Sequence, residues 1–95
     1  MLAKRTSIEI VQEILRMQGK KKTHIMYETS LTYPQTIRYL QYLTERGLIE
    51  VGSDLKGKQI YLTTQTGQEL LRHLDVAMQY LGLGESREIS NSRAG

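Results

Sequence analysis

The segment from Leu31 to Gly47 carries the side chains best suited to chemistry with a partner molecule. Its apolar residues recur at spacings of three and four, which predicts a helix with one buried face. The buried face is expected to hold Tyr33, Thr36, Ile37, Leu40 and Leu43. The opposite face holds Gln35, Arg38, Gln41, Tyr42 and Glu45. Amides, a hydroxyl and one guanidinium on an exposed helix face are groups that can read base edges in a DNA major groove.

Local signals mark both ends of this helix and the elements beside it. Thr32 is suited to the N-cap position, Pro34 to the first turn, and Gly47 to the position after the last turn. A shorter helix over 24–29 precedes it, and a strand over 48–51 follows it directly. Helix, turn, helix and strand in this order are typical of a winged helix-turn-helix.

The other segments complete a mainly helical domain with a small β-hairpin, an α+β fold. The expected elements are a helix over 7–18 capped by Ser7 without a capping box, the helix over 24–29 capped by Thr23, a tight turn at Ser30, strands over 48–51 and 59–62, and a helix over 64–81. The gap between the strands, 52–58, has the glycines and turn formers of an extended hairpin loop, a wing. Outside the long helix, the residues expected to be buried are Ile8, Val11, Ile14, Leu15, Ile25 and Met26, with Tyr27 and Leu31 packing at the turn.

The length of 95 residues predicts a single domain. We expect four regions along the chain: a flexible basic arm over 1–6, the winged helix-turn-helix over 7–63, a C-terminal helix over 64–82 and a disordered tail over 83–95. A single small core gives a chain of this size marginal stability, which favours a dimer.

The C-terminal helix is longer than the first three helices need for cover, because its 18 residues span roughly 27 Å. Its first leucines, Leu70 and Leu71, can close the domain core. The residues expected to meet a second subunit, in a short coiled coil or helix pair, are Leu74, Ala77, Met78 and Leu81. The alternative is that this stripe folds back over the helix at 7–18.

The basic residues are concentrated in the first half of the chain. Residues 1–46 hold eight basic and four acidic residues, a net charge of +4, whereas residues 47–95 hold five and six, a net charge of −1. This asymmetry is typical of a surface that faces phosphates. The lysine run at 20–22 and the wing residues Lys56 and Lys58 are the clearest candidates. The alternative is that both groups are solvated and only keep the protein soluble.

The sequence argues against an enzyme. The two histidines, His24 and His73, lie 49 positions apart without carboxylates or cysteines at ligand spacing, so we expect no metal and no cofactor. Glu9 and Glu13 are four residues apart on an exposed helix face, which is typical of a solvated surface rather than a catalytic pair. No small-molecule substrate is inferred. The lack of cysteine, of a signal peptide and of a membrane-spanning run fits the cytoplasm.

About half of the chain resembles archaeal winged helix-turn-helix proteins, in particular the small dimeric DNA-binding proteins of crenarchaea that are counted among chromatin proteins and regulators. The residues that carry the resemblance are Thr23-His24-Ile25-Met26-Tyr27, Leu31-Thr32-Tyr33, Tyr39-Leu40, Leu43, Gly47-Leu48-Ile49, Tyr61-Leu62-Thr63, Gly67 and Leu70-Leu71. In that group a long helix after the wing forms an antiparallel coiled-coil dimer. Here the helix meets Gly82 and Gly84 early, which departs from the group.

The resemblance implies that the helix at about 32–46 enters the major groove of double-stranded DNA, with the wing at 52–58 on the backbone or minor groove. Arg38 would then contact guanine, Gln35 adenine, and Gln41 and Tyr42 bases or backbone. Residues expected on the phosphates are Lys20, Lys21, Lys22, Thr32, Tyr33, Lys56 and Lys58. The location would be the nucleoid within the cytoplasm.

Two alternatives stay open at this point. Winged helices also serve as protein-docking modules, and the aromatic residues Tyr39 and Tyr42 partly fit such a surface. Within DNA binding, a regulator of particular operators and a broadly binding chromatin protein are both compatible with one arginine and few amides on the reading face.

Overall fold

The computed structural model describes residues 5–82. Its elements are α1 (Ser7–Arg16), α2 (Lys22–Thr29), α3 (Tyr33–Glu45), β1 (Ile49–Ser53), β2 (Gln59–Thr63) and α4 (Gln65–Leu81). The two strands form one antiparallel hairpin. This architecture confirms the predicted fold, mainly helical with a small hairpin. Residues 1–4 and the expected tail at 83–95 lie outside the described residues.

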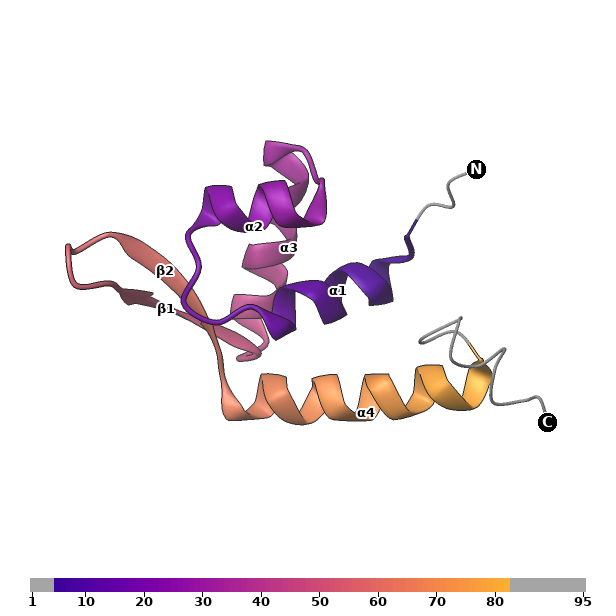
Figure 1. Ribbon diagram of the computed structural model, residues 1–95. Helices are drawn as coiled ribbons and strands as arrows, with labels where there is room; N and C mark the ends of the chain where they lie inside the picture. The colour runs from indigo at the N-terminus through magenta and orange to yellow at the C-terminus, as the bar shows by residue number, and fades with distance from the viewer. Residues whose placement is uncertain (1–4, 83–95) are drawn as a thin grey trace.

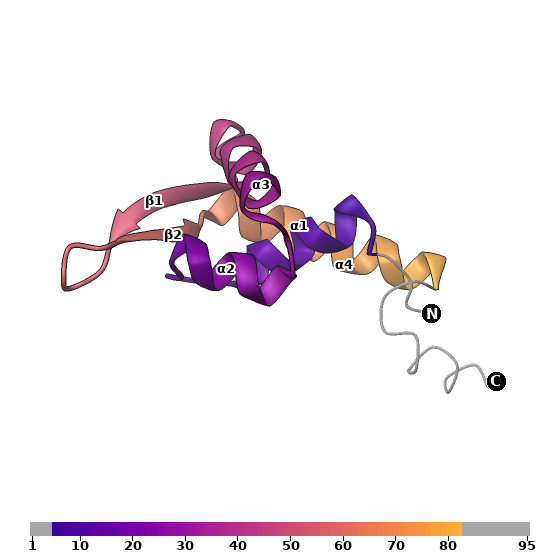
Figure 2. The ribbon, with the colours of Figure 1, turned by 90° about the horizontal axis from the view of Figure 1, so that it is seen from above.

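α1 lies between α2 and α4 (Figure 1). The hairpin projects to one side of the helices, and from above it still extends past them while α1 and α4 run side by side (Figure 2). The core forms where α1, α2, α3 and the base of the hairpin meet; its most buried side chains are Ile14, Leu15, Ile25 and Leu43. Among the described residues, no helix is long and apolar enough to cross a membrane.

The long helix follows its predicted pattern with one exception. Thr36, Leu40 and Leu43 are buried, as expected. Periodicity predicts Tyr33 on the same face, but its side chain is 52% exposed because it is the first residue of α3, beyond the core. The prediction that Tyr27 on α2 packs at the turn is also wrong, since it is 76% exposed.

The N-cap of the first helix lies one residue earlier than predicted. Thr6, not Ser7, is the N-cap: its Oγ1 accepts from the Glu9 backbone N–H at 3.1 Å, and the Glu9 carboxylate accepts from the Thr6 N–H at 2.8 Å. This capping box satisfies two N–H groups at once, which Ser7 could not do with Ile10 at the third position. This helix buries Ile10, whereas the predicted core residue Ile8 is 47% exposed.

Contacts with β2 decide where α1 ends and α2 begins. The Gln18 side chain bonds both backbone groups of Thr63, accepting from its N–H at 3.1 Å and donating to its carbonyl at 3.3 Å, so α1 stops at Arg16 and not near Gln18. Lys20 then pairs with Tyr61 as an isolated β-bridge, a very short extended segment. α2 starts directly afterwards at Lys22, so the prediction of Thr23 as its cap is wrong.

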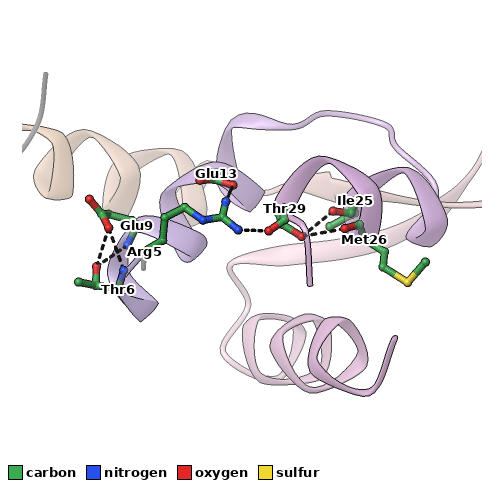
Figure 3. A network of polar contacts seen from close by, with 7 residues as sticks. All are labelled: Arg5, Thr6, Glu9, Glu13, Ile25, Met26 and Thr29. Atoms are coloured by element: carbon green, nitrogen blue, oxygen red, sulfur yellow. Dashed lines mark hydrogen bonds and ion pairs between the residues drawn. The ribbon is translucent and has the colours of Figure 1, made fainter. Parts of the chain in front are cut away.

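Arg5 ties the N-terminal residues to the helix-turn-helix. Its guanidinium donates to the Glu13 carboxylate on α1 and to the backbone carbonyl of Thr29, the last residue of α2 (Figure 3). The buried Thr29 hydroxyl in turn donates to the Ile25 carbonyl at 2.7 Å. Of the expected flexible arm over 1–6, Arg5 is therefore bound to the fold.

α4 begins and ends where predicted. Thr64 caps it by accepting from the Gly67 N–H at 3.0 Å, and Gly82 ends it with a left-handed backbone, φ +76°. Gly67 is required where α4 meets β1, because a Cβ there would lie 2.1 Å from the Leu48 carbonyl oxygen. This contact sets the direction in which α4 leaves the hairpin.

One member of the predicted dimer interface belongs to the monomer core. Met78 is 6% exposed in the single chain, because α4 packs along α1. The expectation that Met78 is left exposed in the single chain is therefore wrong, and its place in a dimer interface stays a prediction. Leu74 is half-buried, whereas Ala77 and Leu81 are exposed.

Candidate nucleic-acid interface

The predicted reading face of α3 is open to solvent. Gln35, Arg38, Gln41, Tyr42 and Glu45 lie on it and are not covered by other elements, as expected. The helix is held rigidly by its buried face and by the turn at its start, where Ser30 adopts a left-handed backbone, φ 59°. A fixed helix with an exposed polar face is the arrangement that presents side chains to base edges.

Thr32 and Gln35 are joined in a second capping box. The Thr32 Oγ1 accepts from the Gln35 N–H at 3.3 Å, and the Gln35 Oε1 accepts from the Thr32 N–H at 3.0 Å. A bidentate contact with adenine needs both the oxygen and the nitrogen of the amide. In this conformation the Gln35 oxygen uses one of its two lone pairs in the cap, which fixes the orientation of the amide. A contact with adenine through both amide atoms of Gln35 therefore has to share this oxygen with the cap.

A groove runs along one side of the exposed face of α3. It has a volume of about 810 Å³ and lies between α1, α3 and α4. The α3 residues that line it are Gln35, Arg38, Tyr39, Tyr42, Leu43 and Arg46. Gln41 is exposed and lies outside the lining, whereas Arg38 is exposed and is also part of the wall. Arg38 and Gln41 thus form the outward part of α3.

Sequence reasoning missed one cationic residue at this face. The Arg46 guanidinium carbon lies 3.9 Å from the centre of the Tyr42 ring, close enough for a cation–π contact. The signal was present in the sequence, since residues four apart on a helix meet on its surface. The stack holds a positive charge at the C-terminal end of α3 and orients Tyr42 along the wall of the groove.

The lysine run lies beside the hairpin and the start of α3. Lys21 is exposed, and the Lys22 ammonium lies 5.6 Å from the centre of the exposed Tyr33 ring. The bridge between Lys20 and Tyr61 fixes this segment against β2. The structure therefore brings the predicted phosphate contacts of α2 and α3 together.

The wing is closed by a single carboxylate. Asp54 Oδ1 accepts from the backbone N–H groups of Lys56 at 2.9 Å and Lys58 at 2.8 Å. The bond from Lys58 is the main cause that lowers the pKa of Asp54, and the charge of Lys21 lowers it further. Gly57 supplies the left-handed residue that this turn needs, φ +80°. Both wing lysines are exposed. The hairpin loop that carries them extends on the same side of the molecule as the start of α2 (Figure 1).

The described residues contain no cluster of three or more side chains that could hold a metal ion. The model of the winged helix-turn-helix family matches residues 4–81, and this chain belongs to that family. A comparison with curated proteins finds no match.

Several solved structures have the same fold. Sso10a-2, a DNA-binding protein from Sulfolobus solfataricus, is 23% identical with a TM-score of 0.72, over 95% of this chain and 96% of that one. MarR from Staphylococcus aureus, in complex with salicylate and kanamycin, is 22% identical with a TM-score of 0.68, over 90% and 57%. A mutant of MepR from S. aureus, bound to an oligodeoxyribonucleotide, is 16% identical with a TM-score of 0.64, over 94% and 72%.

Proposed function

We propose that this protein binds double-stranded DNA as a homodimer and acts as a transcriptional regulator or chromatin protein of the nucleoid, in the cytoplasm. The observation that carries the proposal is the outward face of α3, where Arg38 and Gln41 lie on a rigid helix that nothing covers. The lysines at 20–22 and the two wing lysines, Lys56 and Lys58, are the candidate phosphate contacts that go with this face. The descriptions of Sso10a-2 as DNA-binding and of MepR as bound to an oligodeoxyribonucleotide support the same function.

In this proposal α3 enters the major groove. Arg38 contacts guanine through its two parallel N–H groups, and Gln41 and Tyr42 contact bases or backbone. Gln35 donates from its amide nitrogen while its oxygen keeps the cap with Thr32. Base contacts of this small number give modest direct discrimination.

The phosphates are bound on both sides of the reading helix. Lys21, Lys22 and the hydroxyls of Thr32 and Tyr33 contact one strand, and the wing contacts the backbone or the adjacent minor groove. Each lysine that neutralises a phosphate releases counterions, so affinity falls as salt rises. The pairing of Lys22 with Tyr33 supports a shared phosphate site at the start of α3.

The dimer uses an apolar stripe of α4 that the single chain covers only in part, since its first two leucines are half-buried and its last two residues are exposed. Leu70, Leu74, Ala77 and Leu81 recur at spacings of four, three and four, and Leu81 is 68% exposed. The half-exposed Ile8 lines the groove with Leu70 and Leu74, so it extends the stripe onto α1. Burial of this surface by a second copy would place two α3 helices on one face of the duplex, ideally about 34 Å apart.

DNA binding is tested by fluorescence anisotropy with a random duplex and with a duplex selected from a pool, each titrated with salt. Strong, salt-dependent binding with little difference between duplexes would indicate a chromatin role. A selected duplex bound about 10³-fold tighter or more would indicate a regulator. No binding to either duplex at low salt would refute the proposal and favour a protein-docking module.

Two single substitutions test the role of Arg38. Arg38→Ala should reduce discrimination between the selected and random duplexes by about 1–3 kcal/mol. The matched control is Arg72→Ala, which removes the same charge from an exposed position on α4. A uniform loss on both duplexes would make Arg38 a phosphate contact, and equal effects of the two substitutions would make it a bystander.

The dimer is tested by sedimentation of charged variants. Leu74→Glu and Leu81→Glu should give monomers, because a carboxylate in an apolar contact loses its hydration. Val76→Glu is the control, since Val76 is 45% exposed and does not line the groove. A dimer that survives both leucine substitutions would place the interface elsewhere.

A further inference from the structure

The tip of the wing carries an apolar side chain that the fold does not use. Leu55 has a relative exposure of 105%, so it packs against nothing in the described chain. The hairpin holds it away from the helical core, at the loop between β1 and β2 (Figure 1). A single exposed leucine is ordinary on a protein surface. Its position between charged neighbours at the end of a projecting hairpin is what distinguishes it.

The loop presents Leu55 in a fixed position. Asp54 bonds the N–H groups of Lys56 and Lys58, and its own N–H donates to the Lys58 carbonyl at 2.9 Å. The Gly57 N–H donates to the Asp54 carbonyl at 3.0 Å, which closes the turn beneath the leucine. A closed turn keeps the side chain outward, so little conformational entropy is lost when it enters a partner.

The charges beside Leu55 indicate the kind of partner. Lys56 follows it directly and Lys58 lies three positions on, both exposed, and Lys21 is near enough to lower the pKa of Asp54. Asp54 precedes Leu55, but its carboxylate is turned onto the backbone N–H groups of Lys56 and Lys58. An apolar tip next to exposed lysines fits a polyanion with an apolar interior, which describes stacked bases between two phosphate backbones. Leucine is one of the side chains that wedge between base steps from the minor groove and kink the duplex.

The dimensions of the hairpin limit what can enter. Two paired strands lie about 4.8 Å apart before their side chains are counted, and the minor groove of B-DNA is about 6 Å wide. The whole hairpin is therefore too broad for an undistorted groove, but one side chain at its tip is not. The lysines would remain outside, on the phosphates.

We propose that Leu55 is a minor-groove wedge: it enters between base pairs while Lys56 and Lys58 hold the flanking phosphates, and it bends the DNA toward the major groove. The proposal rests on the proposed function, because it requires that the wing meet duplex DNA. Bending then adds a contribution to recognition that depends on how easily a step unstacks, so pyrimidine–purine steps are favoured.

The experiment measures bending and affinity on the same probe. An A/T-rich duplex of about 30 base pairs carries a donor and an acceptor dye at its ends, so that a bend raises energy transfer. Anisotropy of the same duplex reports binding. The proteins compared are the wild type, Leu55→Ala, Leu55→Met and, as the matched control, Val51→Ala, whose exposed side chain lies on β1 away from the tip.

We expect the wild type, Leu55→Met and Val51→Ala to raise energy transfer at saturation, and Leu55→Ala to bind within about tenfold of the wild type with the bend largely lost. Asp54→Ala, which opens the turn, should weaken the bend although Leu55 is present. Equal bending by the wild type and Leu55→Ala would overturn the wedge and leave DNA binding intact. Absence of binding by the wild type would overturn the proposed function and the wedge together.

Discussion

The contact between α1 and α4 includes one carboxylate, Asp75, that bonds two side chains of α1, and its removal should lower the stability of the fold. Asp75 Oδ1 accepts from the Gln12 amide nitrogen at 2.7 Å. Its two oxygens also accept from the Arg16 guanidinium, at 2.8 Å and 3.0 Å. Gln12 is 7% exposed, so water cannot readily replace its partner.

The cost of Asp75→Ala follows from these contacts. A buried amide left without a partner costs about 1–3 kcal/mol. The ion pair with Arg16 is partly exposed on both sides and contributes about 0–1 kcal/mol. The free energy of unfolding should fall by about 1–4 kcal/mol in total, which lowers Tm by about 4–8 °C per kcal/mol in a domain of this size.

Asp75→Asn separates the two contributions. It keeps an oxygen that can accept from Gln12 and removes the charge that pairs with Arg16. The free energy of unfolding should then fall by about 1 kcal/mol or less. Urea denaturation followed by circular dichroism measures both variants, at two protein concentrations because α4 also carries the proposed dimer stripe.

The same site predicts a dependence on pH. Hydrogen bonds from Arg16, and then from Gln12, lower the pKa of Asp75 below its ordinary value of 3.8, although partial burial opposes them. A lowered pKa in the folded state means that the stabilisation is fully present above about pH 3.8 and is lost as the pH falls through the folded pKa. Asp75→Asn should lack this component. Equal losses for the two variants at neutral pH, or no loss for either, would refute the reasoning.

Three further substitutions test the fold around the site, each by urea denaturation. Gly67→Ala should destabilise by about 1–3 kcal/mol, because the clash with the Leu48 carbonyl outweighs the helix preference of alanine; a more stable variant would contradict the close approach. Thr32→Ala should cost about 1 kcal/mol by removing the cap and should also free Gln35, so an unchanged stability would show that the cap is unimportant. Met78→Ala should cost about 2–5 kcal/mol independently of protein concentration, whereas a cost that depends on concentration would return Met78 to the dimer interface.

The helix α3 shows what local rules can predict. Thr32, Pro34 and Gly47 mark its ends through bonds and backbone angles within a few residues of each position. Such local signals can be recognised without knowledge of the rest of the chain. The start of the first helix follows the same rules, because Thr6 followed three residues later by Glu9 is a capping-box pattern, whereas Ser7 is followed at that spacing by an isoleucine.

Which side of each helix is buried depended on more distant parts of the chain. Ile8 and Tyr33 fit a helical apolar pattern, but each lies at a helix start where no other described element covers it. Met78 fits an exposed stripe equally well, and α1 covers it. Periodicity gives the spacing of a stripe but not its neighbours.

The candidate site likewise has some features that the sequence predicts and others that only the folded structure shows. The sequence by itself determined the helix-turn-helix, the wing and the exposed face with Arg38 and Gln41, because these follow from local periodicity and turn chemistry. Only the tertiary structure decided that Gln12 meets Asp75, 63 positions away. The bond between Gln35 and the Thr32 N–H is local, because Thr32 followed three residues later by Gln35 is also a capping-box pattern. A hydrogen bond needs two groups within about 3 Å. The chain path brings Gln12 and Asp75 within that distance, and sequence spacing gives no measure of it.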